Sequence, residues 1–177
     1  MPRLFTGLEI PSGLAMDLSM LRGGLSGARW IDAENYHLTL RFIGDNDDGT
    51  AREVHSTLER IRQPSFTVTL EGLGSFGSSK PRALIAKARP APALVELQAQ
   101  QERLIRRIGI APDPRKFIPH VTLARLRATT CAGVAEYLSA RGYFFSRQFE
   151  AKRFVLFSSR ASTGGGPYIV EAAYPLG

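Results

Sequence analysis

The chain has 177 residues, about the length of one domain, and its hydrophobic share of 44% and charged share of 22% exclude a disordered protein. It has no run of the roughly 18 apolar residues that a membrane span needs, and residues 1–13 lack the pattern of a secretory signal, so we expect a cytoplasmic protein without a membrane partner. The formal charge of +7 favours a polyanionic partner such as nucleic acid, while the single cysteine, Cys131, excludes an intramolecular disulfide and a cysteine-cluster metal site.

The first part of the sequence twice predicts a strand followed by a helix. Residues 3–10 are β-prone and end at Pro11, and leucines at helical spacing follow over residues 14–21. Residues 36–44 form the next strand pattern, which the sequence GDNDDG ends. A second amphipathic helix then fades by Pro64, and its apolar face consists of Val54, Leu58 and Ile61.

The middle of the chain predicts a hairpin, a long helix and a third strand–helix unit. Residues 66–76 and 82–88 have the alternation of two strands joined by a turn. Residues 92–108 have apolar side chains at helical spacing, and a glycine and two prolines end this pattern. Residues 120–126 then read as a strand, and residues 130–141 as a short helix.

Two closing strands, residues 149–159 and 167–174, flank a GGGP turn. This mixture of hairpins and strand–helix units favours an α+β fold of two small sheets with outer helices over a regular doubly wound sheet. Because no low-complexity tract or long linker divides the chain, we expect a single domain that spans residues 1–177.

The sequences YHLTLRFIG and PHVTLARLR resemble one motif used twice, and their histidines, His37 and His120, are 83 residues apart (120 − 37). Side chains alternate between the two faces of a strand, so His37 and Thr39 share one face. For the same reason His120 and Thr122 share a face, with apolar residues on the other. The pattern predicts two related lobes that each offer an imidazole and a hydroxyl to a cleft.

Two histidines that face one cleft fit in-line displacement at phosphorus. This reaction needs a base beside the entering oxygen and an acid beside the leaving oxygen. The unperturbed pKa of histidine is about 6.5, so one imidazole can be neutral while the other is protonated, which predicts a bell-shaped pH dependence. Thr39 and Thr122 would donate hydrogen bonds to the non-bridging phosphate oxygens. Catalysis of this kind needs neither a metal ion nor a cofactor.

Two other uses of histidine compete with catalysis. Each motif histidine could be a half-exposed strand residue bonded to a neighbouring carbonyl, although two such motifs together favour a functional pair. A metal site is the second use, but no HExxH motif, clustered acids or cysteine ligands accompany these strands. The third histidine, His55, lies among charged residues on a predicted helix, and we assign it no role.

The paired HLTL and HVTL motifs, the opening RLFTGLEIP and the stretches LRFIGD, RIRQPSFTVTLEGLG and FIPHVTLAR together resemble the 2H phosphoesterase superfamily. The sequence is most similar to the bacterial RNA 2′,3′-cyclic phosphodiesterases, also called the LigT-like or 2′–5′ RNA ligase family, over nearly the whole chain. This resemblance implies a bilobal fold of two pseudo-symmetric small antiparallel sheets with outer helices around a central cleft. It also implies metal-independent hydrolysis of a 2′,3′-cyclic phosphate to a 2′-phosphomonoester.

The resemblance also assigns roles to the motif residues. His37 and His120 match the catalytic histidines of the family, and Thr39 and Thr122 match its phosphate-binding hydroxyls. Since the 3′ oxygen must leave, we assign His37 as the acid that protonates it and His120 as the base that activates water. The sequence leaves the opposite order open.

Arg125 matches a family arginine that helps to bind the substrate phosphate. Its odd offset of five residues from His120 turns it to the opposite face unless the strand ends or bulges between them. Arg41, four residues after the first motif histidine, falls on the catalytic face and is the second candidate. Phe5 and Phe117 lie in segments that flank the motifs, and we consider both as surfaces on which a terminal base would stack.

The expected partner is RNA that ends in a 2′,3′-cyclic phosphate, or a small cyclic nucleotide, and we expect the protein to be a monomer. The same chemistry would also act on 2′–5′ linked oligonucleotides, and its reverse would join RNA halves through a 2′–5′ bond. The alternative from another class is a non-catalytic RNA-binding protein that keeps the cleft. Binding alone does not require two titrating imidazoles, so the sequence favours the enzyme.

Overall fold

In residues 3–141, 146–159 and 166–177, which the computed structural model describes, strands and helices are mixed along the whole chain. The strands are β1 (Arg3–Glu9), β2 (Ala28–Trp30), β3 (His37–Asp45), β4 (Phe66–Phe76), β5 (Ala83–Ala88), β6 (His120–Leu126), β7 (Arg147–Ala151), β8 (Arg153–Ser159) and β9 (Tyr168–Pro175). The helices are α1 (Ser12–Ser19), α2 (Asp48–Leu58), α3 (Pro92–Arg107) and α4 (Cys131–Arg141), with a 3₁₀ turn at Ala33–Asn35. The predicted α+β class is confirmed.

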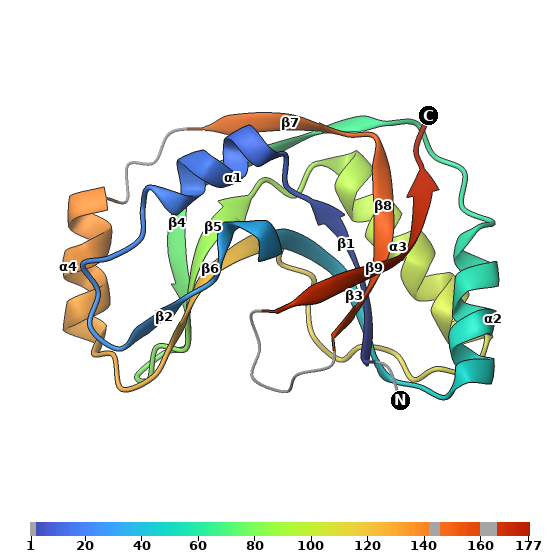
Figure 1. Ribbon diagram of the computed structural model, residues 1–177, viewed down its shortest axis with the longest axis horizontal. Coiled ribbons are helices and arrows are strands. Elements are labelled where there is room, and N and C mark those ends of the chain that lie inside the picture. Colours follow the sequence, from blue (N-terminus) through green and yellow to red (C-terminus); the bar gives the residue numbers. More distant parts are fainter. Residues whose placement is uncertain (1–2, 142–145, 160–165) are drawn as a thin grey trace.

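The strands form two antiparallel groups that meet in the middle of the molecule (Figure 1). One group has the order β7-β4-β5-β6, with β2 also paired to β6, and the other has the order β3-β1-β8-β9. The groups are joined by one antiparallel residue pair between β3 and β6, Leu38 with Val121. The two predicted sheets are therefore linked into one, and this link lies inside the two histidine motifs.

Helices cover the ends of both groups, as the sequence predicts for outer helices. In Figure 1, α2 and α3 lie side by side at one end of the molecule and α4 lies at the opposite end. The helix α3 buries its predicted apolar stripe, which includes Leu94, Leu97 and Ile105, and it contacts β3 and β4. At the start of α2 the Asp47 side chain accepts a hydrogen bond of 2.7 Å from the Thr50 amide, as a helix N-cap does.

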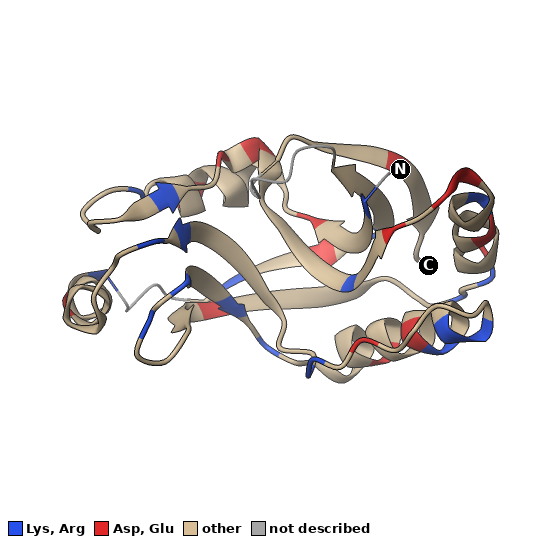
Figure 2. Cartoon of the chain, turned by 90° about the horizontal axis from the view of Figure 1, so that it is seen from below, with Lys and Arg blue, Asp and Glu red and all other residues tan. Residues whose placement is uncertain are grey.

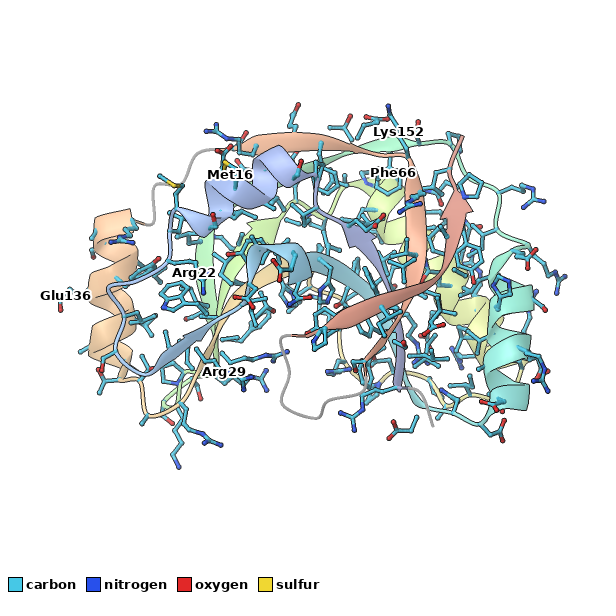
Figure 3. All side chains as sticks on the ribbon, in the orientation of Figure 1. Met16, Arg22, Arg29, Phe66, Glu136 and Lys152 are labelled. Atoms are coloured by element: carbon cyan, nitrogen blue, oxygen red, sulfur yellow. The ribbon has the colours of Figure 1, made fainter. Side chains whose placement is uncertain are left out.

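Most of the predicted elements are confirmed, including the hairpin β4–β5 and the closing pair β8–β9. One prediction is wrong: residues 149–159 do not form a single strand. The chain breaks at Lys152, labelled in Figure 3, because β7 pairs with β4 in one group while β8 pairs with β1 in the other. Half of the predicted GGGP turn, Gly164 and Gly165, lies outside the described residues. The sequence analysis missed β2, a strand of three residues.

In the part of the chain that the structure describes, no helix is both long enough and apolar enough to span a membrane.

Candidate active site

The junction between the two strand groups brings the two histidine motifs together. Leu38 and Val121 are fully buried, so the residues on either side of them point to the opposite face of the sheet. Because the two strands are antiparallel, the register next to this pair places His37 alongside Thr122 and His120 alongside Thr39. Two imidazoles and two hydroxyls, from motifs 83 residues apart in the sequence, thus lie on one face.

Both motif strands carry a bulge three residues after the histidine. On β3, Thr39 pairs with Gly7 and Arg41 with Thr6, so the leucine between them has no partner. On β6, Thr122 pairs with Ile85 and Ala124 with Leu84, so Leu123 is the extra residue there. A bulge reverses the alternation of the side chains that follow it. The residue five positions after each histidine therefore returns to the histidine face.

The bulges decide between the two candidate arginines. Arg125 is exposed on the histidine face of β6. The bulge at Leu123 thus allows it to lie on the same face as His120 despite its odd offset of five residues. The prediction that Arg41 lies on the catalytic face is wrong. Arg41 is only 3% exposed, forms an ion pair with Glu102 of α3, and donates to the carbonyl oxygens of Phe42 and, at 2.7 Å, Ala111. It holds a helix, a strand and a loop together behind the site.

Each histidine is oriented by a carbonyl two residues before it. The Nδ1 atom of His37 lies 2.9 Å from the carbonyl oxygen of Asn35, and that of His120 lies 2.7 Å from the carbonyl oxygen of Ile118. A carbonyl only accepts hydrogen bonds, so Nδ1 carries the proton in both rings and donates it. Each neutral ring therefore keeps the lone pair on Nε2 for a substrate.

Aromatic rings fix the two imidazoles further. The ring of His37 has its centre 5.0 Å from that of Phe5 and 4.9 Å from that of Tyr168. The ring of His120 meets Phe76 edge-on at 4.7 Å. These contacts pack against one side of each imidazole and limit its rotation.

Burial also changes the protonation of the histidines. The pKa of His37 is lowered to about 4, mainly by burial and also by the charges of His120 and Arg125, against the opposing hydrogen bond to Asn35. Burial is likewise the main cause that lowers the pKa of His120, and the charge of Arg125 adds to it. These shifts favour the neutral form of both rings in the free protein, and a bound anion would raise both pKa values.

A cavity of about 1010 Å³ lies beside His37 and Thr39. Arg125 and Phe42 line it from the positions after the two bulges, and Arg29 lines it from β2. His120 and Thr122 border the same face but do not belong to this lining. Sequence analysis missed Phe42 and Arg29 because neither a bulge nor a three-residue strand leaves a periodic signal.

The two predicted stacking aromatics lie in other surroundings. Phe5 lines the cavity but is only 4% exposed and packs against His37, so it supports the imidazole from the side. Phe117 is partly buried against the core. Phe42, which is 38% exposed, offers more ring surface to the cavity.

The third histidine is placed elsewhere. His55 also has a threonine two residues later, Thr57, but successive helix residues turn by about 100°, so these two side chains do not share a face of α2. The Nδ1 atom of His55 lies 2.7 Å from the Tyr174 hydroxyl, and its Nε2 atom lies 3.1 Å from Glu59. Among the described residues, no three His, Cys, Asp or Glu side chains gather closely enough to hold a metal ion.

Comparison with known proteins supports the two-motif arrangement. The family model of LigT-like phosphoesterases matches the chain twice, over residues 8–86 and 85–168, and each match contains one histidine motif. The chain belongs to the LigT-like phosphoesterase family. The predicted enzyme class and the two related halves of the LigT-like sequence are thereby confirmed.

Relatives in this family match most of the chain. The RNA 2′,3′-cyclic phosphodiesterase of Aquifex aeolicus is 31% identical over 154 residues, which cover 84% of this chain and 82% of the relative. The enzyme of that name from Escherichia coli is 26% identical over 169 residues, which cover 94% and 92%. The structure of E. coli LigT complexed with 3′-AMP has a TM-score of 0.81, 25% identity and 99% coverage of both chains. A Thermus thermophilus protein shares the fold at a TM-score of 0.84 and 22% identity, covering 98% of this chain and 97% of its own.

Proposed function

We propose that this protein hydrolyses a terminal RNA 2′,3′-cyclic phosphate to a 2′-phosphomonoester, with His37 and His120 as its acid–base pair. The observation that carries the proposal is the Leu38–Val121 pair, because it places two imidazoles and two hydroxyls on one face of the sheet. The activity named for the Aquifex and E. coli relatives supports the choice of substrate.

The proposed reaction is an in-line displacement at the cyclic phosphorus. His120 accepts a proton from a water molecule at Nε2, and the water oxygen forms a new bond to phosphorus. The bond from phosphorus to the 3′ oxygen breaks, and His37 donates the proton that makes this oxygen a hydroxyl. Thr39 and Thr122 donate hydrogen bonds to the non-bridging oxygens, whose negative charge Arg125 balances. Both proton transfers use side chains of this chain and no metal ion.

The acid role requires a protonated His37 in the complex. The pKa of His37 is about 4 in the free protein, but the negative phosphate favours the charged imidazolium and raises this value on binding. We therefore expect the pH profile of kcat to decline at a higher pH than the profile of kcat/KM, since kcat reports the complex and kcat/KM the free enzyme.

A modified substrate distinguishes the acid from the base. A sulfur atom in place of the 3′ oxygen leaves without protonation, so such a substrate should restore activity to His37→Ala and not to His120→Ala. Restored activity in His120→Ala alone would reverse the two roles and leave the pair intact.

The exposed ring of Phe42 is the surface that we propose for the terminal base, because it lies on the cavity face and is more accessible than Phe5. The proposed partners are RNA with a cyclic phosphate end and small cyclic nucleotides. The expected monomeric state and cytoplasmic location stay predictions.

The decisive experiment incubates the protein in EDTA with an oligonucleotide that ends in a 2′,3′-cyclic phosphate and determines the position of the product phosphate. We expect a 2′-phosphate. A 3′-phosphate would contradict the proposed bond cleavage, and loss of activity in EDTA would contradict the metal-independent mechanism. Tight binding without turnover would support the alternative, an RNA-binding protein that keeps the cleft.

A further inference from the structure

Arginine side chains line the cavity well beyond the two histidine motifs. Among the described residues, its lining includes Arg3, Arg29, Arg125 and Arg127 and no carboxylate. Arg3 belongs to β1, in the other strand group. Arg29, Arg125 and Arg127 are exposed and belong to β2, β6 and the residue directly after β6. Figure 2 shows basic segments on several strands in the half of the molecule that carries α4.

The arrangement of these three arginines concentrates positive charge. Arg29, labelled in Figure 3, is the direct antiparallel partner of Arg125 across β2 and β6. Directly opposed residues on neighbouring strands have their Cβ atoms about 5 Å apart, where two like charges destabilise the sheet. Arg127 follows two residues after Arg125, and its amide donates a hydrogen bond to the carbonyl of Gly27, the residue before β2. An anion between these guanidinium groups would accept hydrogen bonds from them.

Arg125 lies five residues after His120 along the chain, and its charge lowers the pKa of both His37 and His120. Arg127 lies two residues further along the chain, directly after β6, and Arg29 lies on the neighbouring strand β2. Arg125 therefore faces the reacting phosphate, which leaves Arg29 and Arg127 for a neighbouring anionic group. The cavity, at about 1010 Å³, reaches the upper end of the roughly 300–1,000 Å³ of small-ligand sites, which leaves room for more than the terminal nucleotide.

We propose that Arg29 and Arg127 bind the backbone phosphate that precedes the terminal nucleotide, so that the site favours an RNA chain over a cyclic mononucleotide. This inference rests on the proposed phosphodiesterase function and adds a second phosphate subsite to it. A guanidinium group donates to phosphate oxygens in a forked geometry, and such contacts fix the register of a chain without reading its bases.

The test compares two substrates in wild type, Arg29→Gln and Arg127→Gln. One substrate is adenosine 2′,3′-cyclic phosphate, and the other is a tetranucleotide with the same cyclic end. Each variant should lower kcat/KM for the tetranucleotide about tenfold more than for the mononucleotide, as expected for one charged hydrogen-bonded contact. It should also reduce the slope of log kcat/KM against log salt concentration by about 0.7 for the tetranucleotide.

Arg103→Gln is the matched control, since Arg103 is exposed on α3, outside the cavity lining, and its loss changes the net charge equally. It should leave the ratio between the two substrates at the wild-type value. Equal losses for both substrates in the cleft variants would mean that Arg29 and Arg127 act on the reacting phosphate, and no loss would mean that they are solvated surface residues. Either result overturns the inference.

A binding measurement separates this inference from the proposed function. The same proteins are titrated with the tetranucleotide that ends in a 2′-phosphate and with adenosine 2′-phosphate. If the wild type hydrolyses neither substrate, the phosphodiesterase proposal fails, while tighter tetranucleotide binding that depends on Arg29 and Arg127 would still support the second subsite. Equal affinity of the wild type for both ligands overturns it.

Discussion

Arg41 and Arg125 follow their motif histidines by four and five residues, yet mutation should reduce stability at the first and activity at the second. Arg41 is 3% exposed and joins the Glu102 carboxylate to two backbone carbonyls, whereas Arg125 is exposed in the cleft. Arg41→Met leaves Glu102 without its partner, and breaking a buried ion pair costs about 3–5 kcal/mol. For a protein of this size each kcal/mol lowers the melting temperature by about 2–4 °C, so we expect a decrease of about 6–20 °C.

Arg125→Met should lower the free energy of unfolding by no more than about 0.5 kcal/mol, because it removes an exposed side chain. It should lower kcat/KM by about 100-fold, since it removes a positive charge that faces the reacting phosphate. The assays are urea unfolding and turnover of a cyclic-phosphate substrate well below the melting temperature of each variant. Arg41→Met should then keep the wild-type kcat/KM. If Arg41→Met unfolds as the wild type does but loses activity, the bulges do not separate the two arginines as described.

Three further predictions concern the histidines and the junction between the strand groups. Because burial lowers the pKa of His37 to about 4, the unfolded chain binds more protons between about pH 6.5 and 4. The contribution of His37 to the free energy of unfolding should be fully present above pH 6.5 and be lost as the pH falls towards 4. In urea unfolding, His37→Gln should therefore lose less stability over this range than the wild type, and equal losses would contradict the lowered pKa of His37. In NMR titrations, inorganic phosphate should raise the pKa of His37, and an unchanged value would mean that no anion binds beside it. Leu38 and Leu97 are both fully buried, so Leu38→Ala and the control Leu97→Ala should each lose about 2–5 kcal/mol of stability. Only Leu38→Ala should lower the kcat of the folded protein. Equal kcat values for the two variants would contradict a role for the junction.

The fold was predictable where side chains repeat with a period. The apolar residues of α3, including Leu94, Leu97 and Ile105, recur at helical spacing, and both motif strands begin with strict alternation. The break at Lys152 was not predictable, because the two strands on either side of it have continuous β-prone sequence. Only their partners, β4 and β1, show that the chain passes from one group to the other.

The site was predictable up to the bulges. Alternation places His37 and Thr39 on one face, but the unpaired Leu40 that follows has nothing in its sequence to distinguish it from a paired strand residue. Strict alternation of side chains therefore placed Arg41 on the wrong face and gave no reason to select Phe42. The spacing of histidine and threonine alone does not identify a site. His55 and Thr57 have the same spacing, but on the helix α2 it does not bring the hydroxyl beside the imidazole.

Single-turnover rates of His37→Ala, His120→Ala and the double variant test the acid–base pair most directly. Residues that act as one unit give strongly non-additive losses, so each single variant should lose several orders of magnitude and the double variant little more. Circular dichroism of each variant controls for the fold. Single variants that retain near wild-type rates, or losses that multiply in the double variant, would contradict a shared role of the two histidines in one displacement at phosphorus.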